Sequence, residues 1–157
     1  TNTPEKFKEY TNYKLAGDHF SNAGPLGGIH AALITSSKDA LFVFAGDMPL
    51  LAKELIITQI DLYCSTKCDI LVPEIDKYSE PLHAIYNMSI LNKLEEYLSS
   101  DNNYAVRDFF KHVDVKYMQL GDSEKSKIAF TNINAPGDIS LVKKILAIPP
   151  DRKGKIV

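Results

Sequence analysis

The sequence predicts an α/β protein built around a largely parallel sheet. Segments with helical spacing of apolar residues alternate with short, strand-like apolar runs along most of the chain, and this alternation is typical of helices layered on a parallel sheet. The chain has 157 residues, which is enough for one domain, because a chain near 150 residues buries roughly 68–70% of its unfolded surface. We therefore expect one domain over residues 1–147 and a C-terminal tail over residues 148–157.

The first half of the chain holds the clearest strand signal. Residues 41–45 are apolar throughout, which indicates a buried strand, and residues 52–67 are amphipathic and long enough for a helix. The predicted elements of this half are, in order, a short helix at 4–10, a strand at 13–16, a helix at 26–36, the strand at 41–45, the helix at 52–67 and a strand at 69–74.

The second half continues the alternation, beginning with a strand at 82–87 that mixes apolar and polar positions. Helices are predicted at 89–99 and 104–112, strands at 115–120 and 127–131, and a last helix at 137–146. The chain begins on "TNTPEKF" with no apolar strand before its first helix, whereas a doubly wound domain usually starts on a central strand. We therefore expect that an N-terminal strand–helix unit is missing from it.

Composition and charge argue against several kinds of partner. The formal net charge is -2, with both signs mixed along the chain, so it gives no general attraction to nucleic acid or to an anionic membrane. The apolar segments are far shorter than the roughly 18–20 residues that span a bilayer. The first residues also lack the basic-then-apolar pattern of a signal peptide. We expect a cytoplasmic protein.

A glycine-rich loop follows the predicted strand at 13–16. It reads "DHFSNAGPLGGIH" and places Asp18 ahead of a helix start, where glycines let the backbone approach a ligand and free N–H groups are available. It lacks the Gly-Lys-Ser/Thr ending of a phosphate-binding Walker loop. Two interpretations remain, a base or ribose contact and a plain tight turn with proline near the helix start. The loop residues concerned are Gly24, Pro25, Leu26, Gly27 and Gly28.

A carboxylate follows the apolar strand at 41–45. In "FVFAGDMPLL", one glycine separates Asp47 from that run, and Asp47 lies between Gly46 and Pro49. An ionised carboxylate is costly in a dry strand unless it is paired, so one at the strand's mouth indicates a partner cation. Mg2+ fits best, because one or two carboxylates typically hold it while substrate phosphates supply other ligands. The alternative is that Asp47 caps the helix at 52–67 or closes a turn.

Two further polar features are candidates for binding. In "FTNINAPGD", Asn132 and Asn134 are two residues apart, so in extended geometry they project to the same side. Paired amides can donate to phosphate or fix a pterin-like ring, and the alternative is a turn-and-cap signal. Arg107 is the only arginine before the tail. It is an anion-binding candidate, with an exposed helix ion pair as the alternative.

Taken together, four segments in order resemble the molybdenum cofactor guanylyltransferase family, the molybdopterin-guanine dinucleotide biosynthesis protein A type. They are "GPLGGIHAAL", "FVFAGDMPLL", "EPLHAIYN" and "FTNINAPGD". The resemblance covers about residues 1–147. It implies a Rossmann-like nucleotidyltransferase fold with a mostly parallel three-layer sheet. It also implies transfer of GMP from GTP to molybdopterin, with Mg2+ and with release of pyrophosphate.

The resemblance also implies roles for single residues. Asp47 matches the family's magnesium and GTP aspartate, which makes it the expected catalytic and metal-binding residue. Asp18 matches an acid that helps bind the guanine nucleotide, Asn2 matches an asparagine at the preceding strand end, and the loop 24–28 lies beside that pocket. Asn132 and Asn134 match paired asparagines on the molybdopterin side, where we also place Arg107. Proteins of the molybdenum cofactor pathway are the implied protein partners.

One departure from the family concerns phosphate binding. The signature Leu-Ala-Gly-Gly-x-Ser-x-Arg-Met-Gly should precede all these motifs, and this sequence does not contain it. "KLAGD" at 14–18 is only a fragment of it, because no Arg-Met-Gly follows. Two alternatives therefore stay open. One is a nucleotidyltransferase of the same fold that uses CTP or another metabolite, and the other is a truncated, non-catalytic domain for nucleotide binding or interaction.

Overall fold

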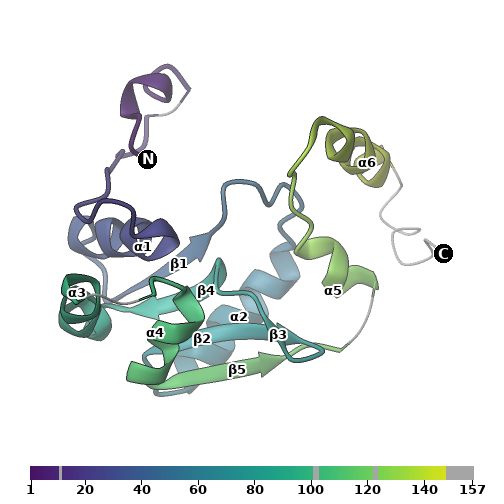
Figure 1. Cartoon of the computed structure of the whole chain (residues 1–157). Helices are drawn as coiled ribbons and strands as arrows, with labels where there is room; N and C mark the ends of the chain where they lie inside the picture. Colours follow the sequence, from purple (N-terminus) through teal and green to yellow (C-terminus); the bar gives the residue numbers. More distant parts are fainter. Residues whose placement is uncertain (11, 101–102, 122–123, 148–157) are drawn as a thin grey trace. The chain divides into compact units, whose positions relative to one another are not determined.

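The computed structural model describes residues 1–10, 12–100, 103–121 and 124–147 (Figure 1). The predicted tail at 148–157 lies outside these residues, and the single domain over 1–147 stays a prediction. The elements are, in chain order, η1 (Pro4–Lys6), α1 (Gly24–Thr35), β1 (Ala40–Phe44), α2 (Lys53–Ser65), β2 (Ile70–Ile75), β3 (Tyr78–Ser79), β4 (His83–Asn87), η2 (Met88–Ile90), α3 (Leu91–Ser99), α4 (Val106–Phe109), η3 (Phe110–His112), β5 (Val115–Gln119), α5 (Glu124–Ala129) and α6 (Pro136–Ala147).

The strands form one five-stranded sheet in the order β1-β4-β2-β3, with β5 pairing with β2. Hydrogen bonds at the two ends of the β1–β4 pair give the direction of β4. Ala45 N–H donates to the Leu82 carbonyl, and Met88 N–H donates to the Asp39 carbonyl. Residue numbers therefore rise along one strand as they fall along the other, so β4 runs antiparallel to β1.

The pairing of β5 with β2 has the opposite sense. Ile70 N–H donates to the Asp114 carbonyl at one end, and Leu120 N–H donates to the Glu74 carbonyl at the other. Residue numbers rise together along the two strands, so this pair is parallel. The predicted α/β class is confirmed, but the sheet is mixed rather than largely parallel, because β4 runs antiparallel to β1 and β3 antiparallel to β2.

A tight hairpin that the sequence did not predict joins β2 to β3. Ile75 lies opposite Tyr78 in antiparallel register, and the two residues between them, Asp76 and Lys77, have φ angles of 49° and 69°. Positive φ at both central residues defines a type I′ turn, which matches the right-handed twist of the flanking strands. The strand was missed because β3 is only two residues long and the turn lacks the usual Asn-Gly signal.

Two predicted strands are wrong. Residues 14–16 are irregular, and Tyr13 beside them is a bend with 87% of its surface exposed, so this segment has no buried face. The segment 127–131 falls largely in α5, where Ile128 is partly buried and its neighbour Ala129 is buried. In a strand, neighbouring side chains point to opposite faces, whereas in a helix two neighbouring residues can both face the interior. The predicted helix at 4–10 shortens to η1, and that at 104–112 divides into α4 and η3.

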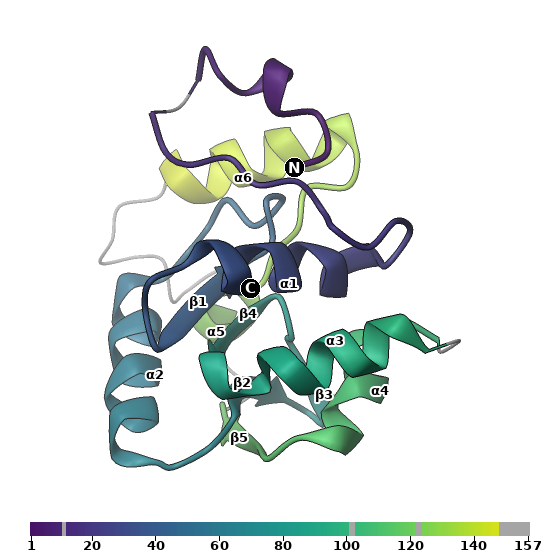
Figure 2. The ribbon, with the colours of Figure 1, turned by 90° about the vertical axis from the view of Figure 1, so that its left-hand side faces the viewer.

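The chain divides into two compact units, and their boundaries cut through the strands. Unit 1 holds Thr1–Val43, Cys68–Ile70 and Ile85–Lys116, and unit 2 holds the remaining described residues. In unit 1, α1 and α3 pack side by side (Figures 1 and 2). No helix of the described residues is long and apolar enough to cross a membrane.

Polar side chains are built into the interior of unit 2. Gln59 on α2 is fully buried, and its Nε2 donates to the carbonyl oxygens of Leu71 at 3.2 Å and His83 at 3.1 Å. The His83 ring meets the rings of Phe44 and Phe130 edge to face. In each pair the two ring centroids are 5.0 Å apart. Burial lowers the pKa of His83. This environment favours the neutral form of the histidine.

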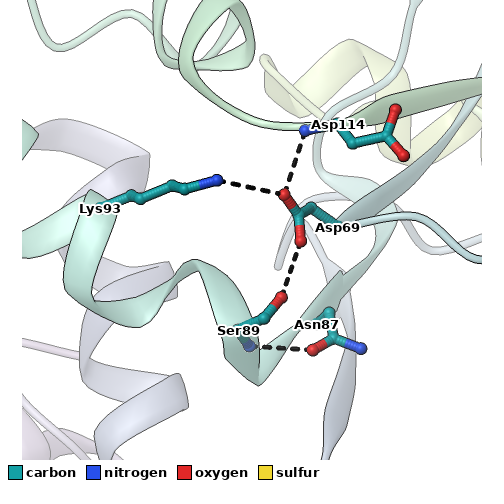
Figure 3. A network of polar contacts seen from close by, with 5 residues as sticks. All are labelled: Asp69, Asn87, Ser89, Lys93 and Asp114. Carbon is teal, nitrogen blue, oxygen red and sulfur yellow. Dashed lines mark hydrogen bonds and ion pairs between the residues drawn. The ribbon is translucent and has the colours of Figure 1, made fainter.

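The Asp69 carboxylate ties together three segments of unit 1 (Figure 3). One oxygen, Oδ1, accepts from Ser89 Oγ at 2.7 Å. The other, Oδ2, accepts from Asp114 N–H at 3.1 Å and lies 3.6 Å from Lys93 Nζ. Ser89 N–H in turn donates to Asn87 Oδ1 at 2.8 Å. One side chain thus fixes the start of β2, the end of β4 and the segment before β5.

This network makes a prediction about acid stability. Partial burial by itself would raise the pKa of Asp69, but the Asp114 N–H, the Ser89 hydroxyl and the Lys93 ammonium together hold it below its usual range. The charged form therefore stabilises the fold at pH values above the ordinary carboxyl range, and this contribution is lost as pH falls through the lowered pKa.

We expect Asp69→Asn to lower the free energy of unfolding by about 1–3 kcal/mol near neutral pH, because hydrogen bonds to a charged acceptor are lost. The difference from the wild type should shrink as the pH falls. Urea unfolding at a series of pH values measures it, with Asp61→Asn, an exposed aspartate on α2, as the control. A difference that stays constant down to acid pH would contradict this account of Asp69.

Candidate functional site

Asp18 and Asn2 hold each other in unit 1. Asn2 Nδ2 donates to Asp18 Oδ2 at 2.9 Å, and Asp18 N–H donates to Asn2 Oδ1 at 2.9 Å. The amide side chain of Asn2 therefore pairs with both the backbone and the carboxylate of Asp18, and these two hydrogen bonds hold the two residues together. The structure brings together two residues that the sequence predicted as nucleotide-binding.

The Asp18 carboxylate lies against the first turns of α1. A Cβ at Gly27 would lie 3.3 Å from Asp18 Cγ and 3.3 Å from Ala23 Cβ, and a Cβ at Gly28 would lie 4.0 Å from Asp18 Oδ1. The N-terminal end of a helix favours negative charge. The absence of a side chain at Gly27 is thus what lets the carboxylate approach the helix.

The remaining residues of the glycine loop differ in their exposure. Gly24 has a φ of +55°, a left-handed conformation that favours glycine. Gly24 and Pro25 are exposed. Leu26 is fully buried in the core, so its side chain anchors the helix and leaves only its backbone to face a ligand.

Asp47 lies exposed in the turn that follows β1, in unit 2. Met48 N–H donates to the Ala45 carbonyl at 3.3 Å, which closes the turn, and the Asp47 carbonyl accepts from Ile133 N–H at 2.9 Å. The helix-cap alternative is excluded, because α2 has Ala52 at its N-cap and no side-chain cap. The turn therefore uses the backbone of Asp47 and leaves its carboxylate in solvent.

The hydrogen bond from Ile133 brings the two predicted asparagines next to the Asp47 turn. Asn132 is half-buried, and its Oδ1 is a buried acceptor with no partner among the described residues. Asn134 is exposed. Its backbone N–H donates to Asp138 Oδ2 at 2.8 Å, which holds the loop at the start of α6. The two amides do not follow a strand, so the expected reason for their alignment is wrong, although they do lie beside Asp47.

Arg107 lies in unit 1, exposed on α4. The neighbouring Asp108 accepts from Lys111 Nζ at 2.6 Å and from Asn103 Nδ2 at 3.1 Å. The predicted anion site at Arg107 therefore borders a local ion pair, and Asn132 and Asn134 belong to the other unit.

In the turn after β1, Asp47 offers an exposed carboxylate to a metal ion. Among the described residues there is no group of three or more His, Cys, Asp or Glu side chains that could hold one. Mg2+ keeps several waters and is often held by one or two carboxylates together with substrate phosphates. The exposed Asp47 suits that mode of binding, whereas a preformed cage of protein ligands is not found in this part of the chain.

The structure is thus an α/β fold in which a glycine loop begins α1 and an exposed carboxylate follows β1. A family model described as the MobA-like NTP transferase domain matches residues 1–116. The chain belongs to this family.

Individual relatives extend the likeness beyond the matched range. The chain is 32% identical over 154 residues to a probable molybdenum cofactor guanylyltransferase of Natranaerobius thermophilus, covering 93% of this chain and 74% of the relative. It is 28% identical to the molybdenum cofactor guanylyltransferase of Vibrio vulnificus, covering 84% of this chain and 66% of that protein.

A solved structure agrees with these relatives. The crystal structure of molybdopterin-guanine dinucleotide biosynthesis protein A from Archaeoglobus fulgidus matches with a TM-score of 0.77 and 28% identity, over 92% of this chain and 74% of that one. The fold predicted from the resemblance is confirmed.

The contact between Gly27 and Asp18 predicts opposite outcomes for two neighbouring glycines. Replacing a helical glycine by alanine stabilises a helix by up to about 1 kcal/mol. We expect Gly28→Ala to show such a gain, because its Cβ meets Asp18 Oδ1 only at 4.0 Å. Gly27→Ala should lose the gain or become destabilising, because its Cβ would lie 3.3 Å from a side chain that Asn2 already holds. Urea unfolding compares them, and equal gains at both positions would contradict the proposed packing.

Proposed function

We propose that this chain transfers GMP from GTP to molybdopterin and releases pyrophosphate, as a molybdenum cofactor guanylyltransferase of the cytoplasm. The observation that carries the proposal is the exposed Asp47 carboxylate in the turn after β1, whose backbone carbonyl accepts from Ile133 N–H, the residue between the two asparagines. Family membership and the names of the relatives support the same reaction.

The proposed roles follow the two groups of residues. Asp18, oriented by Asn2 and the glycine loop 24–28, would contact the guanine nucleotide. Asp47 would hold Mg2+, which supplies charge neutralisation at the phosphates. Asn132 would offer its unpaired Oδ1 to a donor on molybdopterin, while Asn134 would contact an anionic group on the same substrate. Arg107, in unit 1, stays a separate candidate for contact with an anion. Proteins of the molybdenum cofactor pathway are the proposed protein partners.

The reaction needs little covalent work from the protein. An oxygen of the molybdopterin phosphate attacks the α-phosphorus of GTP, a new P–O bond forms, and the bond to the bridging oxygen of the β-phosphate breaks. Pyrophosphate leaves with that electron pair. Such transfers depend mainly on positioning and on neutralising charge, which is what a fixed turn carrying one free carboxylate and neighbouring amides can supply.

A transfer assay tests the function directly. The chain is incubated with Mg2+, molybdopterin and GTP labelled at the α-phosphate, and both the labelled dinucleotide and pyrophosphate are followed. We expect label to enter the dinucleotide with one pyrophosphate released for each transfer. GTP binding without pyrophosphate release would favour the non-catalytic alternative, and tighter binding of CTP than of GTP by calorimetry would favour the CTP-dependent one.

Asp47 gives the sharpest test of mechanism. We expect Asp47→Ala to lower the transfer rate by at least about 100-fold, because several kcal/mol of charge stabilisation are lost with the metal ligand. The fold should stay intact, since the side chain is exposed and the backbone makes the turn's hydrogen bond. Asp39→Ala, an exposed aspartate just before the same strand, is the matched control. Near-normal transfer by a folded Asp47→Ala protein would sink the assignment.

A further inference from the structure

A histidine and a glutamate join α1 to α3 in unit 1. His30 is only 3% exposed, and its Nε2 lies 3.1 Å from Glu95 Oε1. A carboxylate only accepts hydrogen bonds, so Nε2 carries the proton and donates it. His30 lies nearly two turns after Gly24, where α1 begins at the glycine loop. The bond therefore ties the helix that follows this loop to α3.

The His30 ring also touches the segment that leaves Asp18. His19 and Phe20 follow Asp18 directly in the sequence, and their ring centroids lie 5.8 Å and 5.0 Å from that of His30. Both pairs meet edge to face, with interplanar angles of 72° and 81°, the arrangement that aromatic rings prefer. The His30 ring therefore packs against the first two residues of the segment that leads from Asp18 to Gly24.

A buried histidine is a poor choice for simple packing at this position. Its Nδ1 is buried and has no hydrogen-bond partner among the described residues, and an unpaired buried polar atom costs stability. An apolar side chain of similar size would fill the space without that cost. What the histidine adds is direction, because the bond from Nε2 to Glu95 sets the orientation of the ring.

We propose that the His30–Glu95 pair is a positioning element of the nucleotide site, which orients residues 19–23 and so holds Asp18 where it meets the guanine nucleotide. This inference rests on the proposed function for its ligand. Neither residue touches the nucleotide. The pair acts through the rings of His19 and Phe20 and through the start of α1.

Preorganisation determines the expected effect. A loop that is already oriented does not have to be ordered when the ligand binds, so loosening it weakens binding. Loss of the pair should raise the Kd and KM for GTP about tenfold and leave kcat within about twofold of the wild type, since the chemistry at Asp47 is untouched.

Four variants separate positioning from simple packing. His30→Leu keeps bulk and removes the bond, and His30→Gln keeps a donor near the place of Nε2 and should restore most of the affinity. Glu95→Ala removes the acceptor from a side chain that is 47% exposed, so it should fold even if His30→Leu does not. Glu96→Ala, an exposed glutamate at the next position of the same helix, is the matched control.

Two measurements test the proposal. Calorimetry gives the Kd for GTP, and hydrogen–deuterium exchange without nucleotide follows the amides of residues 19–24. We expect weaker GTP binding and faster exchange in this segment for His30→Leu and Glu95→Ala, and unchanged values for Glu96→Ala. Unchanged exchange and unchanged Kd in a folded Glu95→Ala protein, or an equal change in Glu96→Ala, would overturn the inference. Absence of GTP binding by the wild type would instead count against the proposed function, and the exchange measurement would still decide the role of the pair.

Discussion

A backbone hydrogen bond of 2.9 Å from Ile133 N–H to the Asp47 carbonyl oxygen joins two loops that are far apart in the sequence. The Ile133 side chain packs against a small hydrophobic cluster that contains Leu50, Val142 and Ile145. Apolar contacts with Leu50, which follows the turn after β1, and with Val142 and Ile145 of α6 therefore hold the residue that donates this bond. Because the backbone groups of the turn are satisfied in this way, the Asp47 side chain has no structural task, and the arrangement of unit 2 around the candidate site depends on this link.

The two aspartates of the candidate site are prepared for different tasks. Asp18 has both its carboxylate and its backbone N–H paired with Asn2, and it lies against the start of α1. That surrounding fixes its direction, which suits recognition of a particular base or ribose. Asp47 is exposed, and an exposed carboxylate suits a cation that arrives with its own phosphate ligands. The division agrees with a reaction in which one part of the protein recognises the nucleotide and another neutralises the charge of its phosphates.

Sequence patterns correctly predicted the long amphipathic helices and the strand with a continuous apolar run. They were wrong for short elements whose structure is decided by tertiary contacts. The helix at 26–36 was found because one of its faces is buried, and the strand at 41–45 was found from its apolar run, although the residues of β1 are only half-buried. The predicted strand at 127–131 is wrong because Ala129 is buried and its neighbour Ile128 is partly buried, a pattern that five residues of sequence do not assign to a helix or a strand. Strand direction in β4 leaves no mark on periodicity. Asp47 and Asp18 were predicted as site residues from the resemblance and from their places after predicted strands, of which the one at 13–16 is absent, and their roles stay predictions. The His30–Glu95 bond joins two helices and has no local signal.

The proposed function requires that the Asp47 carboxylate and the phosphates of GTP share one divalent cation. Electron paramagnetic resonance of Mn2+, used in place of Mg2+, measures this directly, because free and bound Mn2+ give different signals. We expect weak Mn2+ binding to the chain alone and much tighter binding when GTP is added. In Asp47→Asn, GTP should no longer tighten Mn2+ binding. Tight Mn2+ binding with GTP that is the same in Asp47→Asn as in the wild type would contradict it.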